Sequence, residues 1–184
     1  MKYIDVLITE DMLAHAVSVE SLLRINRTRA SSIDTLTGAV GELAFADWFL
    51  GDWRLHDLTS TKGQIDFLNA IEVKTSTFPF SEQLNLLVRS DYANVRSPKV
   101  YVQNIICTSD RRARQIIPGT NCRLAGWATH EKVVSAPLKD FGSKFGGPGG
   151  YSCHHIKIMN LHPMSALFIL ISLINKSSKY LCFL

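Results

Sequence analysis

The fold of this chain is decided by the stretch from position 64 to 74, which reads Gln64-Ile65-Asp66-Phe67-Leu68-Asn69-Ala70-Ile71-Glu72-Val73-Lys74. Polar and apolar residues alternate at both ends of the stretch, which is typical of two short strands that each have one solvated and one buried face. The solvated face would collect two carboxylates, an amine and an amide: Gln64, Asp66, Glu72 and Lys74. This combination predicts a metal site that cleaves phosphodiesters.

The connection between the two strands determines which residues face each other. A two-residue turn would place the two carboxylates on opposite faces of the hairpin. A three-residue loop, Leu68-Asn69-Ala70, or an equivalent bulge, instead pairs Asp66 with Glu72. The same register pairs Phe67 with Ile71. Loops of this length usually need one left-handed residue, and the central Asn tolerates that conformation. We therefore predict an odd or bulged connection.

Phosphodiester hydrolysis requires stabilisation of negative charge on phosphorus and activation of water, and a divalent cation does both. Mg²⁺ prefers hard oxygen ligands, which Asp66 and Glu72 would supply. Lys74 lies two residues after Glu72, so in a strand it projects from the same face and can hold the attacking water or neutralise the phosphate. Gln64, opposite Lys74 in this register, can orient a water or a phosphate. The alternative is an ordinary surface hairpin with a Glu–Lys pair.

A helix is predicted from Asp34, a suitable N-cap residue, to Leu50. The residues one turn before and after Glu42 are small or apolar, so Glu42 belongs to a packed stripe. Gly38 and Gly41 reduce helix propensity, and close approach of the helix to a sheet is a reason to keep them. A Glu on the packed side needs a partner, which a metal or its bound water would supply. The alternative is a Glu at the helix edge whose carboxylate reaches solvent.

Together, Gly38–Phe45, Gln64–Phe67 and Ile71–Ser76 resemble the PD-(D/E)XK nuclease superfamily, the fold of many restriction enzymes, archaeal Holliday-junction resolvases and lambda-type exonucleases. The resemblance covers residues 34 to 76. It departs from the family pattern at Ile65, where a proline often precedes the aspartate. It implies four roles: Glu42 as the helix acid, Asp66 as the central metal ligand, Glu72 as the second ligand and Lys74 as the catalytic lysine.

The resemblance implies a Mg²⁺-dependent endonuclease that hydrolyses DNA, similar to restriction enzymes or Holliday-junction resolvases. Mn²⁺ is expected to substitute for Mg²⁺. Two alternatives stay open: a module that keeps the fold without the chemistry and binds nucleic acid or protein, and a nuclease acting on RNA. Many members of the superfamily act as dimers, so a homodimer is also possible.

The rest of the chain predicts an α/β fold, with a mixed central β-sheet flanked by helices. A first helix is expected over 9–26, and Thr129 is expected to cap a short helix that runs to 134. Residues 90–95 are ambiguous. Strands are expected at 53–58, 84–88, 99–108, 123–129 and 151–159.

A chain of 184 residues suits one domain. We expect a single nuclease-like domain over 1–164, with its core at 34–134, and an apolar C-terminal appendage over 165–184. The apolar run Ala166–Ile174 is shorter than the roughly 20 residues that a membrane-spanning helix needs, so no membrane association is expected. A core-packing helix, a dimer contact and a peripheral appendage remain alternatives.

Composition and charge bear on the partners and the compartment of the protein. The net charge of +4 is compatible with an anionic partner. Arg111, Arg112 and Arg114 form a cluster that would contact DNA phosphates, the alternative being a solvated loop. Four cysteines without a C-x-x-C spacing, and a start without an apolar targeting region, predict reduced thiols and a cytoplasmic protein. No zinc site is expected around Cys153-His154-His155, because the spacing matches no tetrahedral set.

Overall fold

The computed structural model describes residues 2–27, 32–59, 64–110, 115–140 and 151–170. Its strands are β1 (Ile4–Leu7), β2 (Ile71–Phe78), β3 (Asn85–Arg89), β4 (Val100–Cys107), β5 (Asn121–Thr129), β6 (Leu138–Asp140) and β7 (Ser152–Lys157). Its helices are α1 (Glu10–Arg27), α2 (Ser32–Leu50), α3 (Ser90–Val95) and α4 (His130–Val134), with 3-10 turns η1 (Trp53–Leu55), η2 (Ile158–Asn160) and η3 (Met164–Ala166).

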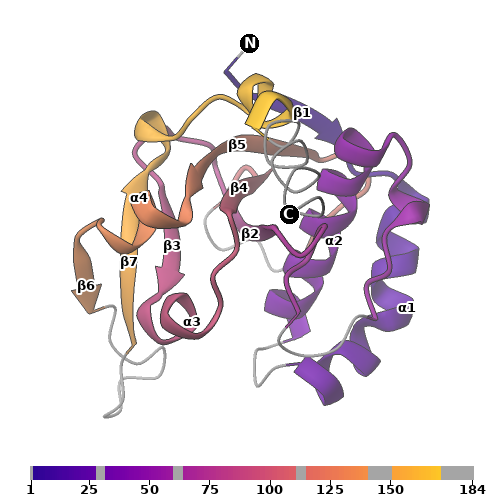
Figure 1. The fold of residues 1–184 in the computed structure, drawn as a ribbon. Helices are drawn as coiled ribbons and strands as arrows, with labels where there is room; N and C mark the ends of the chain where they lie inside the picture. Colours follow the sequence, from indigo (N-terminus) through magenta and orange to yellow (C-terminus); the bar gives the residue numbers. More distant parts are fainter. Residues whose placement is uncertain (1, 28–31, 60–63, 111–114, 141–150, 171–184) are drawn as a thin grey trace, which may run out of the picture.

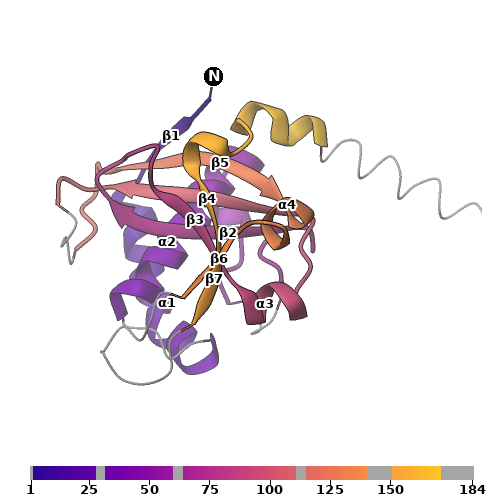
Figure 2. The ribbon, with the colours of Figure 1, turned by 90° about the vertical axis from the view of Figure 1, so that its left-hand side faces the viewer.

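The strands form two sheets. The larger has the order β1-β5-β4-β2, in which β2 and β4 are parallel and the other neighbours are antiparallel. The smaller is antiparallel, with the order β3-β7-β6. Helices α1 and α2 lie on one side of the larger sheet, and the smaller sheet lies on the other with α3 and α4 (Figure 1; Figure 2). The predicted mixed sheet flanked by helices is therefore confirmed.

Strand alternation divides the core into two layers. Val100, Val102 and Ile106 of β4 belong to the layer beneath α2, whereas Tyr101 and Ile105 belong to the layer that faces the smaller sheet. Because both faces of β4 are covered, nearly every residue of this strand is buried. The prediction of a central buried strand at 99–108 is confirmed.

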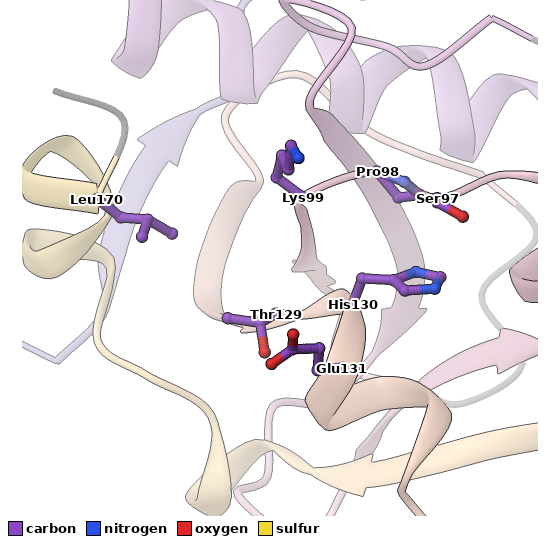
Figure 3. A pocket seen from close by; sticks show the side chains of 7 residues that line it. All are labelled: Ser97, Pro98, Lys99, Thr129, His130, Glu131 and Leu170. Carbon is purple, nitrogen blue, oxygen red and sulfur yellow. The ribbon is translucent and has the colours of Figure 1, made fainter. Parts of the chain in front are cut away.

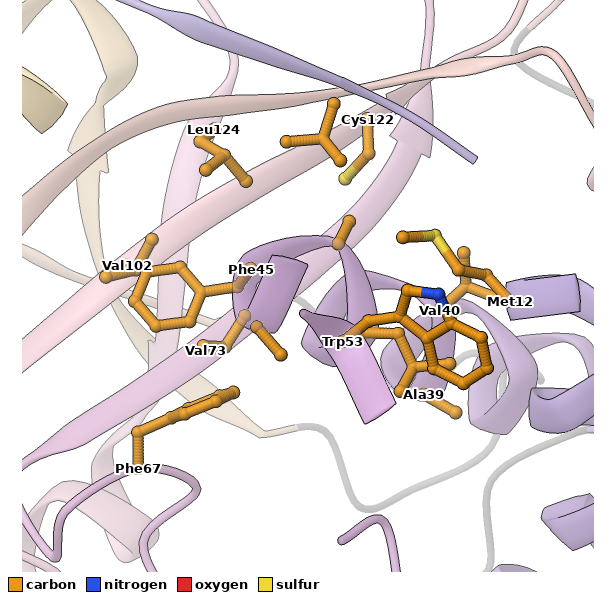
Figure 4. Packing of buried hydrophobic residues seen from close by; sticks show 14 of the residues in the cluster. Met12, Ala39, Val40, Phe45, Trp53, Phe67, Val73, Val102, Cys122 and Leu124 are labelled. Carbon is orange, nitrogen blue, oxygen red and sulfur yellow. The ribbon is translucent and has the colours of Figure 1, made fainter. Parts of the chain in front are cut away.

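Helix α2 fits against the larger sheet through its apolar residues. The Phe45 ring meets the Phe67 ring edge-on, with 4.8 Å between centroids. Figure 4 shows Phe45 beside Val73 of β2 and Val102 of β4. Phe45 and Val102 are fully buried, and Val73 nearly so. The packing explains why nine residues of α2 are buried, since the helix lies in the interior on more than one side.

The closest approach between α2 and the sheet occurs at Gly41. A Cβ built at Gly41 would lie 2.6 Å from the Cβ of Thr75 and closer still to its Oγ1. The buried Asn104 side chain of β4 donates a hydrogen bond to the Gly41 carbonyl oxygen, at 2.9 Å. A side chain larger than hydrogen at position 41 would therefore push the helix away from β2. The predicted role of a glycine in close helix–sheet packing is confirmed for Gly41 and wrong for Gly38, where a Cβ would meet nothing within 4 Å.

Several local predictions can be compared with the structure. Thr129 caps α4, because its Oγ1 accepts from the Lys132 backbone N–H at 3.2 Å. The expected strand at 53–58 is wrong: Asp52 caps the 3-10 turn η1 by accepting from the Arg54 N–H, which draws the chain into a turn. Residues 90–95, ambiguous in sequence, form α3.

The described start of the C-terminal appendage continues from η3 as helix through residue 170. Leu167 is buried, and the Phe168 ring stacks on Phe49 of α2 with 5.5 Å between centroids. This part of the appendage therefore packs on the end of α2, and residues 171–184 lie outside the described part of the chain. Among the described residues, no helix is long and apolar enough to cross a membrane.

Replacing Gly41 by alanine should destabilise the protein by about 1–3 kcal/mol, because the new methyl group overlaps Thr75. Gly38→Ala in the same helix is the matched control, since a Cβ there meets nothing within 4 Å. The control should be neutral or up to about 1 kcal/mol more stable through helix propensity. Urea unfolding of both variants measures the difference, and equal stabilities would contradict the close-approach argument. Adding Thr75→Ala to Gly41→Ala should restore part of the loss.

Candidate active site

The loop before β2 has the length that the sequence predicts. Phe67 and Ile71 form an isolated antiparallel bridge, with hydrogen bonds of 3.0 and 2.9 Å between their backbone groups. Three residues lie between them, and Leu68 and Asn69 both have positive φ, at 51° and 50°. The predicted three-residue connection and the Phe67–Ile71 pair are confirmed, with two left-handed residues instead of one.

The ladder ends at this bridge, so residues 64–66 do not form the expected strand. In a continued antiparallel ladder the Val73 N–H would bond to the Ile65 carbonyl. Instead the Asp66 carboxylate accepts this N–H at 2.7 Å. A charged acceptor makes a stronger hydrogen bond than a carbonyl, which gives a physical reason for the exchange. The predicted pairs of Asp66 with Glu72 and of Gln64 with Lys74 are therefore wrong.

The ladder partners of β2 come from β4. Glu72 lies opposite Tyr101, and Lys74 lies opposite Gln103. The buried Gln103 side chain donates to the Lys74 carbonyl oxygen at 3.1 Å. This parallel pairing makes β2 a neighbour of the central strand and leaves its other edge to Asp66 and Phe67.

Glu72 and Lys74 project from one face of β2, as the sequence predicts. The Lys74 ammonium donates to Glu72 Oε1 at 2.6 Å. An Arg96 guanidinium nitrogen lies 3.8 Å from the same oxygen. The other oxygen, Glu72 Oε2, is buried without a hydrogen-bond partner in the described part of the chain. A buried, unpartnered carboxylate oxygen is costly, so this atom is available to a ligand that can bring positive charge.

Glu42 is held by a residue that the sequence analysis missed. The His56 Nε2 lies 3.1 Å from Glu42 Oε2, and both side chains are nearly buried. The His56 ring stacks on Phe67, with centroids 4.2 Å apart and planes 16° from parallel. The signal for a partner was present, because a Glu in a packed stripe needs one. The sequence did not indicate which residue it would be.

Asp66 is electrostatically influenced by the two other acids. Burial raises the pKa of its carboxyl well above the ordinary value, and the charges of Glu42 and Glu72 raise it further. The Lys74 charge and the Val73 N–H oppose these effects without cancelling them. The charges of Glu42, Glu72 and Lys74 all act on the Asp66 carboxyl, so the four side chains share one electrostatic environment. Helix α2 contributes the first, the loop before β2 the second, and β2 the other two.

Of the other predicted site residues, the structure describes only one. Gln64 is exposed and lies before the bridge. Arg111, Arg112 and Arg114 lie outside the described residues. Two further side chains take part that the sequence analysis did not select: His56, which bonds to Glu42, and Arg96, which approaches Glu72.

The donor chemistry of the site fits a hard divalent cation, although its present arrangement is not that of a finished metal centre. Among the described residues, no group of three or more His, Cys, Asp or Glu side chains could hold a metal ion as arranged. Glu42 is turned to His56, and one oxygen of Glu72 to Lys74 and Arg96. The unpartnered Glu72 Oε2 and the raised pKa of Asp66 are both features that a bound cation would relieve.

A separate hollow of about 340 Å³ lies where β5 meets α4 (Figure 3). None of the four clustered residues lines it; the lining residues are Ser97, Pro98, Lys99, Thr129, His130, Glu131 and Leu170. Its His130 Nδ1 lies 3.4 Å from the hydroxyl of Tyr101, the β4 residue opposite Glu72. Burial and the Glu72 charge raise the pKa of Tyr101 to about 12, so this hydroxyl keeps its proton at neutral pH.

Comparisons of the chain with protein-family models, with curated proteins and with solved structures found no match.

In the metal-free protein, Asp66→Asn should raise the free energy of unfolding above that of wild type by more at pH 7 than at pH 4. The folded pKa of Asp66 is raised, so the unfolded chain releases this proton first, and wild-type stability falls from about pH 4 upward through the folded pKa. Asparagine is neutral throughout this range and still offers an oxygen to the Val73 N–H. Urea unfolding at several pH values measures the effect.

Asp66→Ala is the control, because it removes the charge and also the acceptor of the Val73 N–H. It should be less stable than Asp66→Asn by about 1 kcal/mol. If the stabilities of wild type and Asp66→Asn change with pH in parallel, the folded protein does not raise the pKa of Asp66.

Proposed function

We propose that this protein is a Mg²⁺-dependent nuclease that hydrolyses phosphodiester bonds in DNA. The observation that supports the proposal is the half-buried carboxylate of Asp66, whose pKa is raised first by burial and then by the charges of Glu42 from α2 and Glu72 from β2. An ammonium group, that of Lys74, lies on the same site. Acids that destabilise one another in a buried site, next to a cation that can reach an anionic substrate, are typical of metal-assisted phosphoryl chemistry.

Asp66 and Glu72 would hold the metal, with Glu42 contributing directly or through a water. A bound Mg²⁺ would supply Lewis acidity at a phosphoryl oxygen and lower the pKa of a coordinated water. The protein's part is to position these oxygens. The Val73 N–H fixes one oxygen of Asp66, and the strand backbone fixes the direction of Glu72.

Lys74 has two tasks in this mechanism. In the metal-free protein its ammonium group neutralises Glu72 Oε1. Its side chain remains 30% exposed, so the ammonium can also meet a phosphate oxygen or hold the attacking water. A cation near the developing negative charge lowers the barrier most when it acts in a site that excludes water.

A second function, a binding module without catalysis, is favoured by one specific observation. Glu42 and Glu72 already have protein partners, in His56, Lys74 and Arg96. If these pairs are permanent, the site is a structural network and no cation enters it. Action on DNA instead of RNA, substitution by Mn²⁺, and a homodimer stay predictions that rest on the family resemblance.

Metal binding separates the two functions. Mg²⁺ or Mn²⁺ at about one hundred times its dissociation constant should stabilise the wild-type protein by about 2.7 kcal/mol. Glu72→Gln should abolish this gain, because it removes the charge of a proposed ligand. Thermal unfolding with and without the metal is the measurement, and Glu131→Gln, which alters an exposed acid outside the site, is the matched control. Equal stabilisation of both variants would contradict the proposed ligands.

Lys74→Ala should reduce Mg²⁺-dependent cleavage of plasmid and branched DNA by roughly 10²–10³-fold, the typical effect of removing one group that stabilises transition-state charge. Lys157→Ala serves as the control, because Lys157 is an exposed amine on β7 that donates a surface hydrogen bond to the Gln83 side chain. Gel analysis of the products gives the rates. Equal cutting by wild type and Lys74→Ala would remove Lys74 from the mechanism. If wild type cuts no DNA, the binding module is the better reading.

A further inference from the structure

The surface of α3 combines an aromatic ring with two guanidinium groups. Tyr92 lies on this helix and is 44% exposed. The guanidinium carbons of Arg89 and Arg96, at the two ends of the helix, lie 4.6 and 5.4 Å from the centre of its ring. Arg89 also lies 5.3 Å from the ring centre of Tyr151 on the neighbouring part of the chain. We call Arg89, Tyr92 and Arg96 the α3 surface.

The α3 surface is continuous with the candidate active site. Arg96 caps the C-terminal end of α3, and one of its guanidinium nitrogens lies 3.8 Å from Glu72 Oε1. A strand bound across Tyr92 would therefore reach the carboxylates directly after Arg96. The Arg96 side chain is 26% exposed, so a phosphate from solvent can reach its guanidinium group.

The two arginines differ in how strongly they are held. Arg89 makes two hydrogen bonds to the carboxylate of Asp91, at 3.0 and 2.6 Å, so its charge is neutralised. Arg96 lies farther from its acid, which also has the closer Lys74 ammonium at 2.6 Å. Arg96 can therefore move from Glu72 to a phosphate while Glu72 keeps a partner. A guanidinium group suits this role because it can donate two parallel hydrogen bonds to a phosphate.

We propose that the α3 surface binds unpaired nucleotides of a DNA strand next to the catalytic site, with a base on Tyr92 and a phosphate on Arg96. The proposal rests on the proposed nuclease function and adds the substrate class, DNA with a single-stranded segment. Stacking on an aromatic side chain requires a base whose face is free, which the interior of a duplex does not offer. A six-residue helix is also only about 9 Å long, which is short for reading a major groove.

The test measures binding without metal, so that it does not depend on catalysis. The probes are a fluorescent twelve-nucleotide oligo-dT and a twelve-base-pair duplex, titrated with the full chain in EDTA and followed by anisotropy. Wild type should bind the single strand more tightly. Tyr92→Ala should weaken this binding by roughly 5- to 150-fold, the effect of losing one base stack, whereas Tyr92→Phe should retain it.

Two further variants identify the phosphate contact and control for the helix. Arg96→Ala should reduce the slope of log affinity against log salt by about 0.7, as expected for one lost phosphate contact on a single strand. Lys157→Ala, which removes a distant exposed amine, should leave that slope unchanged. Val95 is the most exposed apolar side chain of α3, and Val95→Ala removes neither an aromatic ring nor a charged group. This variant should therefore bind the single strand as wild type does.

The inference is overturned if the duplex binds as tightly as the single strand, if Tyr92→Ala binds like Val95→Ala, or if wild type binds neither probe. Tighter binding of an oligo-U strand than of oligo-dT would overturn the assignment to DNA. Failure of the proposed nuclease function would look different. The protein would then bind oligo-dT in a Tyr92-dependent way but would cleave no DNA in Mg²⁺. Conversely, Mg²⁺-dependent cleavage at equal rates by wild type and Tyr92→Ala, on a substrate with a single-stranded flap, would remove only the role of α3.

Discussion

The close approach of α2 to β2 at Gly41 is the constraint on which the candidate site depends. Without a Cβ at this position, the helix backbone comes near enough for Asn104 of β4 to bond to the Gly41 carbonyl. Glu42 is the next residue, so the contact that fixes the Gly41 backbone also fixes the backbone position from which the Glu42 side chain projects. Because the interior is densely packed, a shift of the helix cannot be absorbed locally and would move this acid relative to Asp66.

The acids of the candidate site are only partly compensated by the side chains and the backbone N–H around them. His56 meets Glu42, while Lys74 and Arg96 share one oxygen of Glu72. Asp66 is held by a backbone N–H, and burial together with its two acidic neighbours keeps its pKa high. A bound cation would compete for these partners, because the Glu42 and Glu72 oxygens that His56, Lys74 and Arg96 approach are also hard oxygen ligands that a divalent metal prefers.

Helix α3, in the segment that leads from the smaller sheet to the larger one, connects the candidate active site to the α3 surface. β3 belongs to the smaller sheet and β4 to the larger, and α3 lies between them in sequence. This crossover brings Arg96 to Glu72, a contact between residues on different elements. The smaller sheet therefore does more than cover the second face of β4: β3 and β7 also contact α3, the helix at whose C-terminal end Arg96 approaches Glu72 (Figure 1).

The sequence by itself determined the elements whose signals are local. The alternation around Leu68-Asn69-Ala70 specified a three-residue loop, and the apolar runs Val100–Val102 and Ile105–Cys107 specified a buried strand. The small and apolar residues around Glu42 specified a closely packed helix. Only the tertiary structure decided that β2 pairs with β4 instead of residues 64–66, and that His56 and Arg96 meet the acids. The reason is physical: alternation fixes which face a side chain occupies, whereas the partner across that face is chosen by packing between segments distant in sequence.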